Sequence, residues 1–599
     1  MRIALQSLAG DTGRVERNAC MSMRRAHVVR TGVLMLLLLC PAAAVYGSTD
    51  LETRNTVSLT IVPDLPRKRV ALTYRFEHPL REVRFDYPAQ MIREDSWLVR
   101  DPDLRLEDDS IRHADGGSIE KLTIDVGLDS SSFDRVYPSL RAIGESGLVF
   151  FTYYAMLEDI PFHEIHIGVA PGSVVAYSRS VYAGSDESVV LPDASGHRGR
   201  YLYLGDAELM GEIEGGLLVA DERLPDWMAA QLRDTIASAA VWLDSYFDAQ
   251  NRERLFVIAT LDGEAENTRW RGDVAPNGEI FLRFQGRGWL EESAELGRIA
   301  ERFLAHELVH LENGSRFKAR EGEPAWLSEG LAEYLELLYI ASNTPDGGGN
   351  FLADEIASKA GRCLFVLQSD RIGISDPAIQ RGDAPYSCGL LAFWIVDGAS
   401  APRWAGARLR RVWSSLVAEI DGAGRVYGVD ELLLALEANG RWDERDLLLT
   451  LIAGPADARW QDRDSMFRRL AVSVTYEYNE AWTGLARTAV IQHVLDLHCE
   501  RGRRGFWTWR DHVQLDTGDR CGPLSGDPRI ERVQGFSVLH EVRDVLASVR
   551  DACGNGGEIE FAVYESSERV KVNCRRAMPA VPPLAVLRGD PTLIPTGSH

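Results

Sequence analysis

The chain has 599 residues, of which 45% are hydrophobic and 26% are charged. At about 100–200 residues per domain, this length predicts a multidomain globular protein, and the composition excludes a disordered or collagen-like chain. The formal net charge of −23 argues against nucleic acid or an anionic membrane surface as the main partner, because both carry negative charge.

Residues 21–47 have the pattern of an export signal and follow a short N-terminal extension. Three arginines between positions 24 and 30 precede an apolar run over 33–40, which is followed by one proline and three alanines. This order of charge, apolar segment and small residues is typical of a secretory signal peptide, and about eight apolar residues are too few to span a bilayer. We therefore expect cleavage after Ala44 or Gly47, an exported protein that is periplasmic or secreted, and no stable membrane span.

Six cysteines follow the expected signal, and an even number in an exported chain suggests disulfides. Fifteen pairings are possible in principle. Pairing of nearest neighbours would join Cys363 to Cys388, Cys499 to Cys521, and Cys553 to Cys574. The last pair has the most support, because it would link the outer ends of two expected strands. The alternative is six reduced, buried thiols.

The sequence from about residue 56 to 218 has a β-strand pattern. Segments such as 57–62 and 122–126 alternate apolar and polar residues, and turn-rich stretches such as 115–118 separate them. We expect an N-terminal β-sandwich-like domain over 48–222, after a signal region that ends at residue 47.

The pattern changes to a mixed sheet and then helices over 223–498. Residues 225–249 carry apolar side chains at the spacing of a long helix, and strands are expected at 255–261 and 279–284. The pattern after these strands is helical for about 200 residues. The overall fold class is therefore multidomain α+β.

Short strands return around one helix beyond Cys499. Residues 530–535 are expected to form a strand and turn, and 540–553 a helix, with two further strands after it. This order resembles the second half of a PDZ domain, so 499–577 is interpreted as a small PDZ-like α+β domain; the alternative is an unrelated α+β cap. The Pro-rich residues 578–599 are expected to form a loosely attached tail.

The most specific motif is His306-Glu-Leu-Val-His310, at the end of an expected helix with Ser293 as its N-cap. At 3.6 residues per turn, the two histidines project from one side of the helix, so both imidazoles can bind one Zn²⁺. Glu307 lies beside that face, where it can take a proton from a water nucleophile. The alternative is a buried helix whose histidines are satisfied by backbone or carboxylate partners.

A catalytic zinc typically has three protein ligands and one open position. Residues 324–334 are expected to form a second helix, on which Glu329 begins an acidic stripe with Glu333 and Glu336. Eighteen residues separate His310 from Glu329, which is enough for a loop and a turn that return an antiparallel helix to the metal. Glu329 is thus the candidate third ligand, and a solvated acidic face is the alternative.

These residues resemble the gluzincin metallopeptidases, in which the second helix has the pattern Trp-Leu-x-Glu-Gly-x-Ala-x-Tyr. The matching residues are, in chain order, His306, Glu307, His310, Trp326, Leu327, Glu329, Gly330, Ala332 and Tyr334. The resemblance implies a thermolysin-like catalytic domain that binds one zinc ion per chain through the two histidines and Glu329, with Glu307 as general base. These enzymes also often carry an acid at the position of Glu336.

The resemblance extends to a Tyr-x-x-Gly sequence that opens a later helix. Here Tyr386-Ser-Cys-Gly389 precedes the apolar segment 390–396. By this resemblance, the Tyr386 hydroxyl donates a hydrogen bond to the developing oxyanion, which is a reasonable use of a phenol. A lone tyrosine would more often serve packing.

The order of signal peptide, β-domain, gluzincin core and PDZ-like end resembles the glycyl aminopeptidase-like branch of these enzymes. Leucyl and alanyl aminopeptidases usually carry a Gly-x-Met-Glu-Asn strand whose glutamate binds the free amine of the substrate. This sequence has Ala275-Pro-Asn-Gly-Glu279 in that region, so Glu279 is the carboxylate that could substitute. The sequence predicts an exported zinc peptidase acting on peptides or proteins, and it leaves aminopeptidase action open.

A second hypothesis comes from a different functional class. It is a periplasmic binding or scaffold protein with a structural or degenerate zinc site, which would need neither Glu307 nor Tyr386. A further metal site built from His493, His498 and Cys499 is a less favoured interpretation than ordinary packing and a disulfide at these positions.

Overall fold

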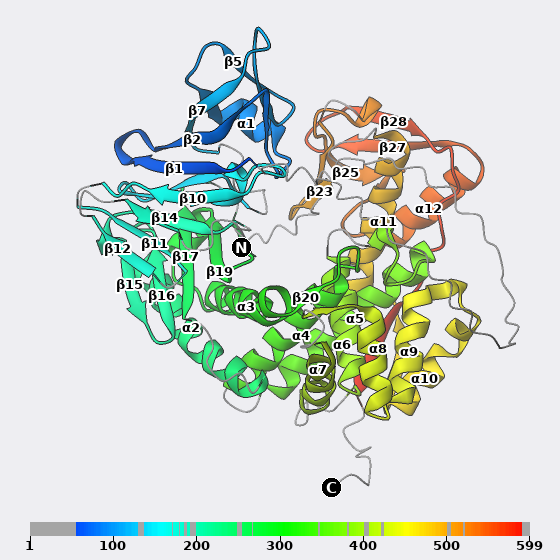
Figure 1. Ribbon diagram of the computed structural model, residues 1–599. Coiled ribbons are helices and arrows are strands. Elements are labelled where there is room, and N and C mark those ends of the chain that lie inside the picture. Colours follow the sequence, from blue (N-terminus) through cyan, green and yellow to red (C-terminus); the bar gives the residue numbers. More distant parts are fainter. Residues whose placement is uncertain are drawn as a thin grey trace, which may run out of the picture.

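The computed structural model describes residues 55–129, 137–170, 172–178, 180–184, 188–191, 199–247, 254–265, 268–344, 348–379, 383–399, 406–420, 425–499, 505–518 and 521–589. The expected export signal lies outside the described residues. Buried apolar side chains form three cores, which follow one another along the chain. Figure 1 shows the first and last as β-rich parts at the two ends of a central unit that carries most of the helices.

The N-terminal core lies between two larger sheets and a smaller one. The sheet orders are β13-β10-β1-β2-β7-β4, β12-β11-β14-β9-β8 and β3-β6-β5. In β1, Val57, Leu59 and Ile61 are buried while the residues between them are partly exposed, which is the expected alternation. The sequence-based prediction of a β-rich N-terminal region is therefore confirmed.

The elements of this region are β1 (Val57–Asp64), β2 (Arg69–Leu80), β3 (Glu82–Arg84), α1 (Gln90–Ser96), β4 (Trp97–Val99), β5 (Leu104–Glu107), β6 (Ser110–His113), β7 (Ile119–Val126), β8 (Leu140–Ile143), β9 (Gly147–Phe151), β10 (Phe162–Ile167), β11 (Val174–Tyr177), β12 (Ser180–Ala183), β13 (Val189–Val190) and β14 (Tyr201–Gly205).

The central unit begins with a five-stranded mixed sheet of order β15-β16-β17-β19-β18. Strand pairs β16–β17 and β17–β19 are parallel, and the two edge strands are antiparallel to their neighbours. The strands are β15 (Met210–Ile213), β16 (Gly216–Ala220), β17 (Leu255–Asp262), β18 (Arg269–Val274) and β19 (Glu279–Gln285). The predicted domain boundary at 222 is wrong, because β15 and β16 belong to this sheet; their short strand pattern does not distinguish them from the strands before them.

This sheet is buried on both faces. On β17, Val257 and Ala259 pack into the helical core, whereas Phe256 and Ile258 pack into the N-terminal β core. Successive side chains of a strand point to opposite faces, so one sheet supplies both cores. The β-rich part and the central unit are therefore joined through a continuous apolar interface.

Helices fill the rest of the central unit. The long helix expected at 225–249 is confirmed as α2, which buries Met228, Leu232, Ile236 and Leu243 at helical spacing. The helices are α2 (Asp226–Phe247), α3 (Ala294–His310), α4 (Trp326–Asn343), α5 (Gly349–Asp370), α6 (Ala384–Val396), α7 (Ala407–Ile420), α8 (Val429–Ala438), α9 (Trp442–Ala453) and α10 (Arg463–Arg469). Short strands β20 (Lys318–Ala319) and β21 (Val426–Tyr427) pair within this region.

The third core contains a sheet of order β23-β24-β25-β27-β28 and two helices. Its elements are α11 (Glu480–His498), β23 (Gly505–Thr508), β24 (Val513–Asp516), β25 (Arg529–Val533), β26 (Phe536–Ser537), α12 (Val542–Gly554), β27 (Glu558–Val563) and β28 (Arg569–Asn573). The predicted start at 499 is wrong, because α11 buries Trp482, Val490 and Val494 in this core. The PDZ-like identity of this part stays a prediction.

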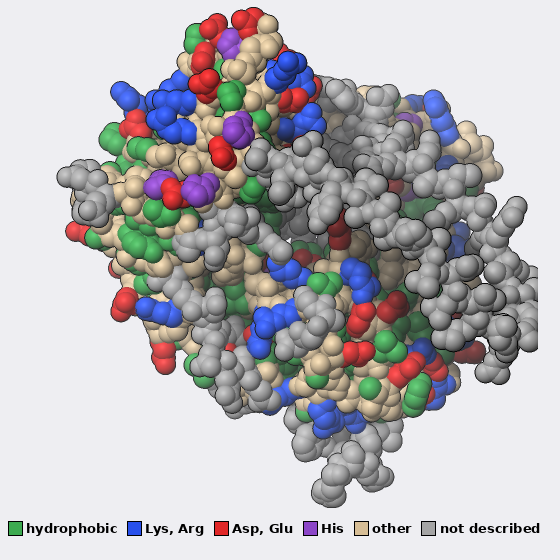
Figure 2. All heavy atoms as spheres, in the orientation of Figure 1, with side chains coloured by type: hydrophobic (Ala, Val, Ile, Leu, Met, Phe, Trp, Pro, Cys, Tyr) green, Lys and Arg blue, Asp and Glu red, His purple; other side chains and the backbone are tan. Residues whose placement is uncertain are grey.

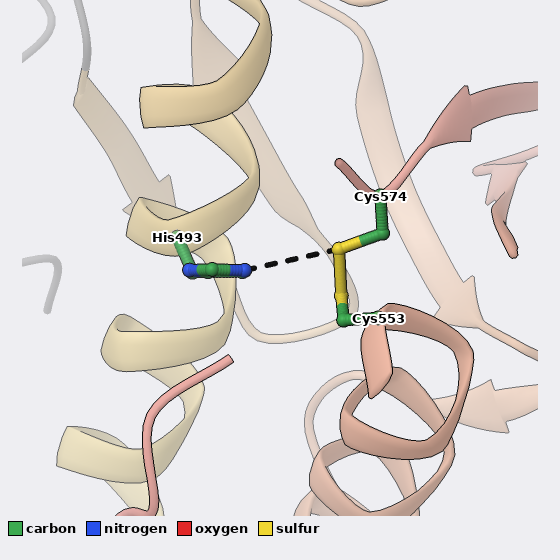
Figure 3. Close-up of side chains that lie close together, drawn as sticks. All are labelled: His493, Cys553 and Cys574. Atoms are coloured by element: carbon green, nitrogen blue, oxygen red, sulfur yellow. Dashed lines mark hydrogen bonds between the residues drawn. A yellow bond between two sulfur atoms is a disulfide. The ribbon is translucent and has the colours of Figure 1, made fainter. Parts of the chain in front are cut away.

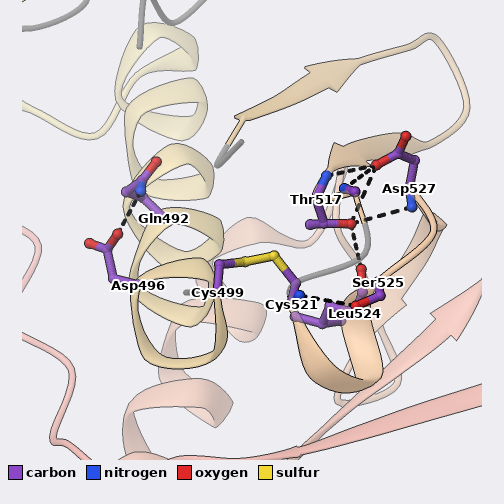
Figure 4. The surroundings of a disulfide bond; sticks show 9 residues. Gln492, Asp496, Cys499, Thr517, Cys521, Leu524, Ser525 and Asp527 are labelled. Carbon is purple, nitrogen blue, oxygen red and sulfur yellow. Dashed lines mark hydrogen bonds between the residues drawn. A yellow bond between two sulfur atoms is a disulfide. The ribbon is translucent and has the colours of Figure 1, made fainter. Parts of the chain in front are cut away.

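Nearest-neighbour pairing of the cysteines is confirmed in all three cases. Disulfides join Cys363 to Cys388, Cys499 to Cys521, and Cys553 to Cys574. The second bridge ties the end of α11 to the loop that holds Thr517, Ser525 and Asp527 (Figure 4). Crosslinks of this kind fit a protein that folds in an oxidising environment.

The expected loose tail contains an ordered strand. Strand β29 (Leu584–Gly589) pairs antiparallel with β22 (Val472–Glu477) and packs closely on α5, where a Cβ added to Gly361 would lie 2.4 Å from the Ala585 carbonyl oxygen. Leu584 is buried in the third core and Leu587 in the helical core. The prediction of a loose tail is wrong for 584–589, because these side chains close both cores; the residues from 590 lie outside the described part.

Acidic and basic side chains are interspersed on the face shown in Figure 2. Among the described residues, no helix combines the length and the apolar character needed to cross a bilayer.

Candidate metal centre

Helix α3 presents the two histidines of the motif on one side. The Ser293 side chain caps its first turn by accepting a hydrogen bond from the Leu296 backbone N–H at 3.5 Å, as expected for an N-cap. The helix buries His306 and holds His310 one turn later in a partly exposed position. It then continues into a single π-helical turn over Leu311–Arg316, which leads the chain towards α4.

Helix α4 returns Glu329 to the two histidines. His306 Nε2 lies 3.2 Å from Glu329 Oε2 and 3.2 Å from His310 Nε2, and His310 Nε2 lies 3.5 Å from Glu329 Oε2. Tetrahedral ligands at zinc-bond lengths of about 2.0–2.2 Å are separated by roughly 3.3–3.5 Å. The three atoms thus converge with the spacing of a zinc ligand set.

Each histidine has an acceptor at its other ring nitrogen. His306 Nδ1 lies 3.3 Å from Glu336 Oε2, and His310 Nδ1 lies 2.9 Å from Asn313 Oδ1. The Asn313 amide in turn donates to the Ser328 carbonyl oxygen at 2.7 Å, which fixes its orientation. An acceptor at Nδ1 favours the tautomer with its proton there and leaves Nε2 free to bind a metal.

Two partly buried cations balance the acidic residues behind His306. Arg302 donates from Nε and Nη2 to Glu336 Oε1 at 3.0 and 2.9 Å, and Lys359 on α5 pairs with Glu333. Burial alone would raise the pKa of Glu336, but Arg302 and His306 hold it below its usual range. The carboxylate beside His306 therefore stays charged and keeps accepting from the imidazole.

The carboxylate of Glu329, the candidate third ligand, is also held in its charged form. Burial alone would raise the pKa of Glu329, but His310 and His306 hold it well below its usual range. A charged Glu329 is the form that binds a metal.

Glu307 projects from α3 towards the edge strand β18. A Cβ added to Gly272 of this strand would lie 2.7 Å from Glu307 Oε1 and 2.7 Å from Phe303 Cζ, so a side chain there would displace the carboxylate or the ring. Burial raises the pKa of Glu307. A raised pKa suits the role of general base expected for this residue.

Strand β18 was not predicted from the sequence. Trp270 and Val274 alternate with polar residues in it, but the glycine and the aspartate between them are residues that strands disfavour. The turn signal Pro276-Asn277-Gly278 before β19, with Gly278 at φ +85°, was the available clue to a hairpin.

Tyr386 lies at the start of α6 with its ring centroid 5.8 Å from that of His306. The negative charge of Glu329, followed by burial, raises the pKa of Tyr386 well above its usual value. The phenol therefore keeps its proton and can act as a hydrogen-bond donor.

Two glycines allow α4 and α6 to cross in contact beside the centre. A Cβ added to Gly330 would lie 2.3 Å from Gly389 Cα, and one added to Gly389 would lie 2.4 Å from Gly330 Cα. Gly330 follows Glu329 directly, and Gly389 comes one turn after Tyr386. The glycine pair thus brings the helices that carry Glu329 and Tyr386 into contact.

Glu279 does not reach this centre. It is fully buried on β19 and accepts a hydrogen bond from Ser178 Oγ of the N-terminal region at 2.5 Å. Its neighbours Ile280 and Leu282 point into the helical core, so the alternation directs Glu279 to the opposite face of the sheet. Glu279, which the sequence left open as a substitute for the amine-binding glutamate, is therefore not placed to take that role.

The second group considered from the sequence, His493, His498 and Cys499, does not form a metal site, and the disulfide favoured there is present. Cys499 is bonded to Cys521, whereas His493 points at the Cys553–Cys574 disulfide, with Nε2 3.8 Å from Cys574 Sγ (Figure 3). Sulfur atoms in a disulfide are not the thiolates that bind metals.

The sequence matches no protein-family profile and no curated protein. The fold is similar to the crystal structure of an aminopeptidase N family protein from Idiomarina loihiensis, with a TM-score of 0.53 and 13% sequence identity. The match covers 90% of this chain and 98% of that chain. At this identity the likeness shows that the two proteins share a mixed α+β multidomain fold.

Proposed function

We propose that this protein is a zinc-dependent peptidase that hydrolyses peptide bonds. The observation that carries the proposal is the convergence of His306, His310 and Glu329 on one point, with Glu307 and Tyr386 on its flanks. The fold shared with an aminopeptidase N family protein supports the same conclusion.

The donor set fits zinc, because two imidazole nitrogens and one carboxylate oxygen leave a fourth position for water or substrate. When bound, zinc acts as a Lewis acid and lowers the pKa of water. Glu307 takes the proton from the attacking water and returns it to the leaving amine, while the Tyr386 hydroxyl donates a hydrogen bond to the developing oxyanion.

We also propose that the protein acts outside the cytoplasm. The export signal predicted at residues 21–47 and the three disulfides support this location.

Strand β18 supplies no carboxylate to bind a free substrate amine. The carboxylate on β18, Asp273, accepts from Arg283 Nη2 at 2.8 Å and from Tyr201, and these residues lie on the face of the sheet turned away from α3. The described part of β18 therefore directs no carboxylate towards the metal ligands. We propose that a glutamate on this strand does not determine whether the peptidase cleaves at the N-terminus of a substrate or at an internal bond.

The test is digestion of a defined peptide mixture, half with free and half with blocked N-termini, followed by mass spectrometry. The zinc-loaded mature protein should cleave, and Glu307→Gln should keep its zinc but lose at least about 100-fold in turnover, because the general base is gone. Glu295→Gln, on the exposed start of the same helix, is the matched control and should behave as wild type.

Two further results decide the ligand set and the functional class. Glu329→Ala should lose zinc during dialysis against a chelator, and an unchanged zinc content would remove Glu329 from the ligands. Bound zinc without cleavage of any peptide would contradict the peptidase proposal and favour the scaffold hypothesis. Trimming of free N-termini alone would identify an aminopeptidase, whereas internal cuts would identify an endopeptidase.

A further inference from the structure

The first two turns of α6, which include Tyr386, are attached to their surroundings on two sides. On one side, Gly389 lies against Gly330 of α4. On the other side, Cys388 is bonded to Cys363 of α5. The disulfide is thus two residues from the tyrosine and leads to a different helix from the one that carries the third metal ligand.

The disulfide lies in the protein interior, with Cys363 0% and Cys388 1% exposed. One residue earlier on α5, Arg362 Nη1 lies 3.4 Å from Asp383 Oδ2, directly before α6. This ion pair is about half exposed and contributes little by itself. The covalent bond is therefore the stronger of the two links between α5 and the start of α6.

Helix α5 is itself anchored to the residues behind the metal ligands. Lys359, one turn before Cys363, pairs with Glu333, and Glu355 accepts from Arg302 Nη1 at 3.3 Å. A link from Tyr386 to α5 is consequently a link to the group of charges that orients His306.

The position of Tyr386 in its helix explains why such a link matters. Tyr386 is the third residue of α6, and the preceding Pro385 has no backbone N–H. The first turn of a helix has unpaired N–H groups and frays most readily. A displacement of about 1 Å in a catalytic group can reduce the rate 100-fold.

We propose that the Cys363–Cys388 disulfide is a positioning element for Tyr386, which holds the hydroxyl where it can donate to the oxyanion. The proposal rests on the proposed peptidase function. If the proposal is right, the disulfide affects turnover only through the Tyr386 side chain. Removing the disulfide should then have no effect on turnover when the Tyr386 hydroxyl is absent.

The test is a double-mutant cycle with the zinc-loaded full chain. Cys363→Ala/Cys388→Ala should lower kcat about 10-fold, with less than about a twofold change in KM and an unchanged zinc content. Tyr386→Phe should lower kcat about 100-fold, since one oxyanion donor is lost. Adding the cysteine pair to Tyr386→Phe should cost less than about twofold more. Equal losses in both backgrounds would overturn the proposal.

The matched control is Cys499→Ala/Cys521→Ala, which removes the bridge in the third core (Figure 4). It should leave kcat within about twofold of wild type. A loss as large as that of the first pair would mean that both bridges act through general stability, and would also overturn the proposal. If the alanine pair does not fold, Cys363→Val/Cys388→Ala restores buried volume without the bond.

A second measurement does not depend on turnover. Fluorotyrosine placed at position 386 should give one narrow ¹⁹F resonance in the otherwise unchanged protein and a shifted or broadened one without the Cys363–Cys388 bridge. An identical resonance in both proteins would overturn the positioning role. Absence of peptide cleavage by wild type would contradict the peptidase proposal alone, because the resonance still reports whether the disulfide holds Tyr386.

Discussion

The imidazole of His306 lies between a metal-binding position at Nε2 and a carboxylate at Nδ1. Glu336 supplies this carboxylate at 3.3 Å, and Arg302 fixes it by two hydrogen bonds. A carboxylate at this place both orients the ring and raises its affinity for a metal. Under the proposed function, Glu336 thus supports the metal centre without being one of its ligands.

Glu336→Gln should therefore weaken zinc binding by about 10–100-fold, because the amide keeps the shape of the side chain but loses its charge. Competition with a chromophoric chelator measures the affinity. Glu355→Gln, which removes another partner of Arg302 farther from the ligands, should change it less than about threefold. Equal losses in the two variants would assign the effect to Arg302 rather than to the His306 contact.

Other residues of the centre could not be found by spacing alone. Gly272 makes room for Glu307, and Asn313 orients His310, yet neither belongs to a metal-ligand pattern. Their roles arise from contacts between separate elements: β18 with α3 for the glycine, and the turn after α3 with the start of α4 for the asparagine.

At the scale of elements, the crossing of α4 and α6 determines how close Tyr386 comes to Glu329. The backbones touch at Gly330 and Gly389, where any added side-chain carbon would fall within 2.4 Å of a backbone atom. Such a contact cannot be relieved by rotating a side chain, so a substitution must separate the helices.

Gly330→Ala should accordingly destabilise the protein by about 1–3 kcal/mol and lower kcat, because Tyr386 moves away from the ligands. Thermal unfolding and peptide turnover are the two measurements. Gly484→Ala on α11 is the matched control, since a Cβ there meets nothing within 4 Å; it should stabilise the protein by about 0.5–1 kcal/mol. A Gly330→Ala protein as stable and as active as wild type would contradict the close crossing.

At the scale of the whole molecule, the central sheet joins the N-terminal β core to the helical core. Glu279 lies in this junction, fully buried, and burial raises its pKa to about 7. In the unfolded chain its pKa is near the ordinary value of 4.5. The folded protein therefore binds this proton more tightly than the unfolded chain.

The contribution of Glu279 to stability should be fully present below about pH 4.5 and be lost as the pH rises through about 7, by an amount on the order of 3 kcal/mol. Glu279→Gln should remove this loss, so its melting temperature should fall less than that of wild type between pH 5 and pH 8. Differential scanning calorimetry measures both. Glu212→Gln, at an 80% exposed side chain, should follow the wild-type curve, and parallel curves for Glu279→Gln would contradict the raised pKa.

Strand β29, the last described strand, also connects separate parts of the molecule. β29 pairs with β22 and contributes Leu584 to one core and Leu587 to another. Its sequence is short and follows several prolines, a pattern that by itself predicts a loose tail. Burial of its side chains in the two cores stabilises the strand, and the local sequence does not show this burial.

The sequence by itself determined what depends on local spacing. The His306–His310 pair and the helix α2 follow from a period of 3.6 residues, and the bridge between Cys553 and Cys574 follows from two adjacent strands. The candidate third ligand, Glu329, came from a longer spacing together with a family resemblance, and the fold brings it within hydrogen-bond distance of His306.

The tertiary structure decided what depends on which surfaces meet. It assigned β15 and β16 to the central sheet, α11 to the third core, and Glu279 to the face away from the metal ligands. Apolar alternation shows that a side chain is buried, but it does not show against which partner. Which surface packs against which decides the domain boundaries. It also decides the contact of Gly272 with Glu307 and the crossing at Gly330 and Gly389, so these features follow only from the folded chain.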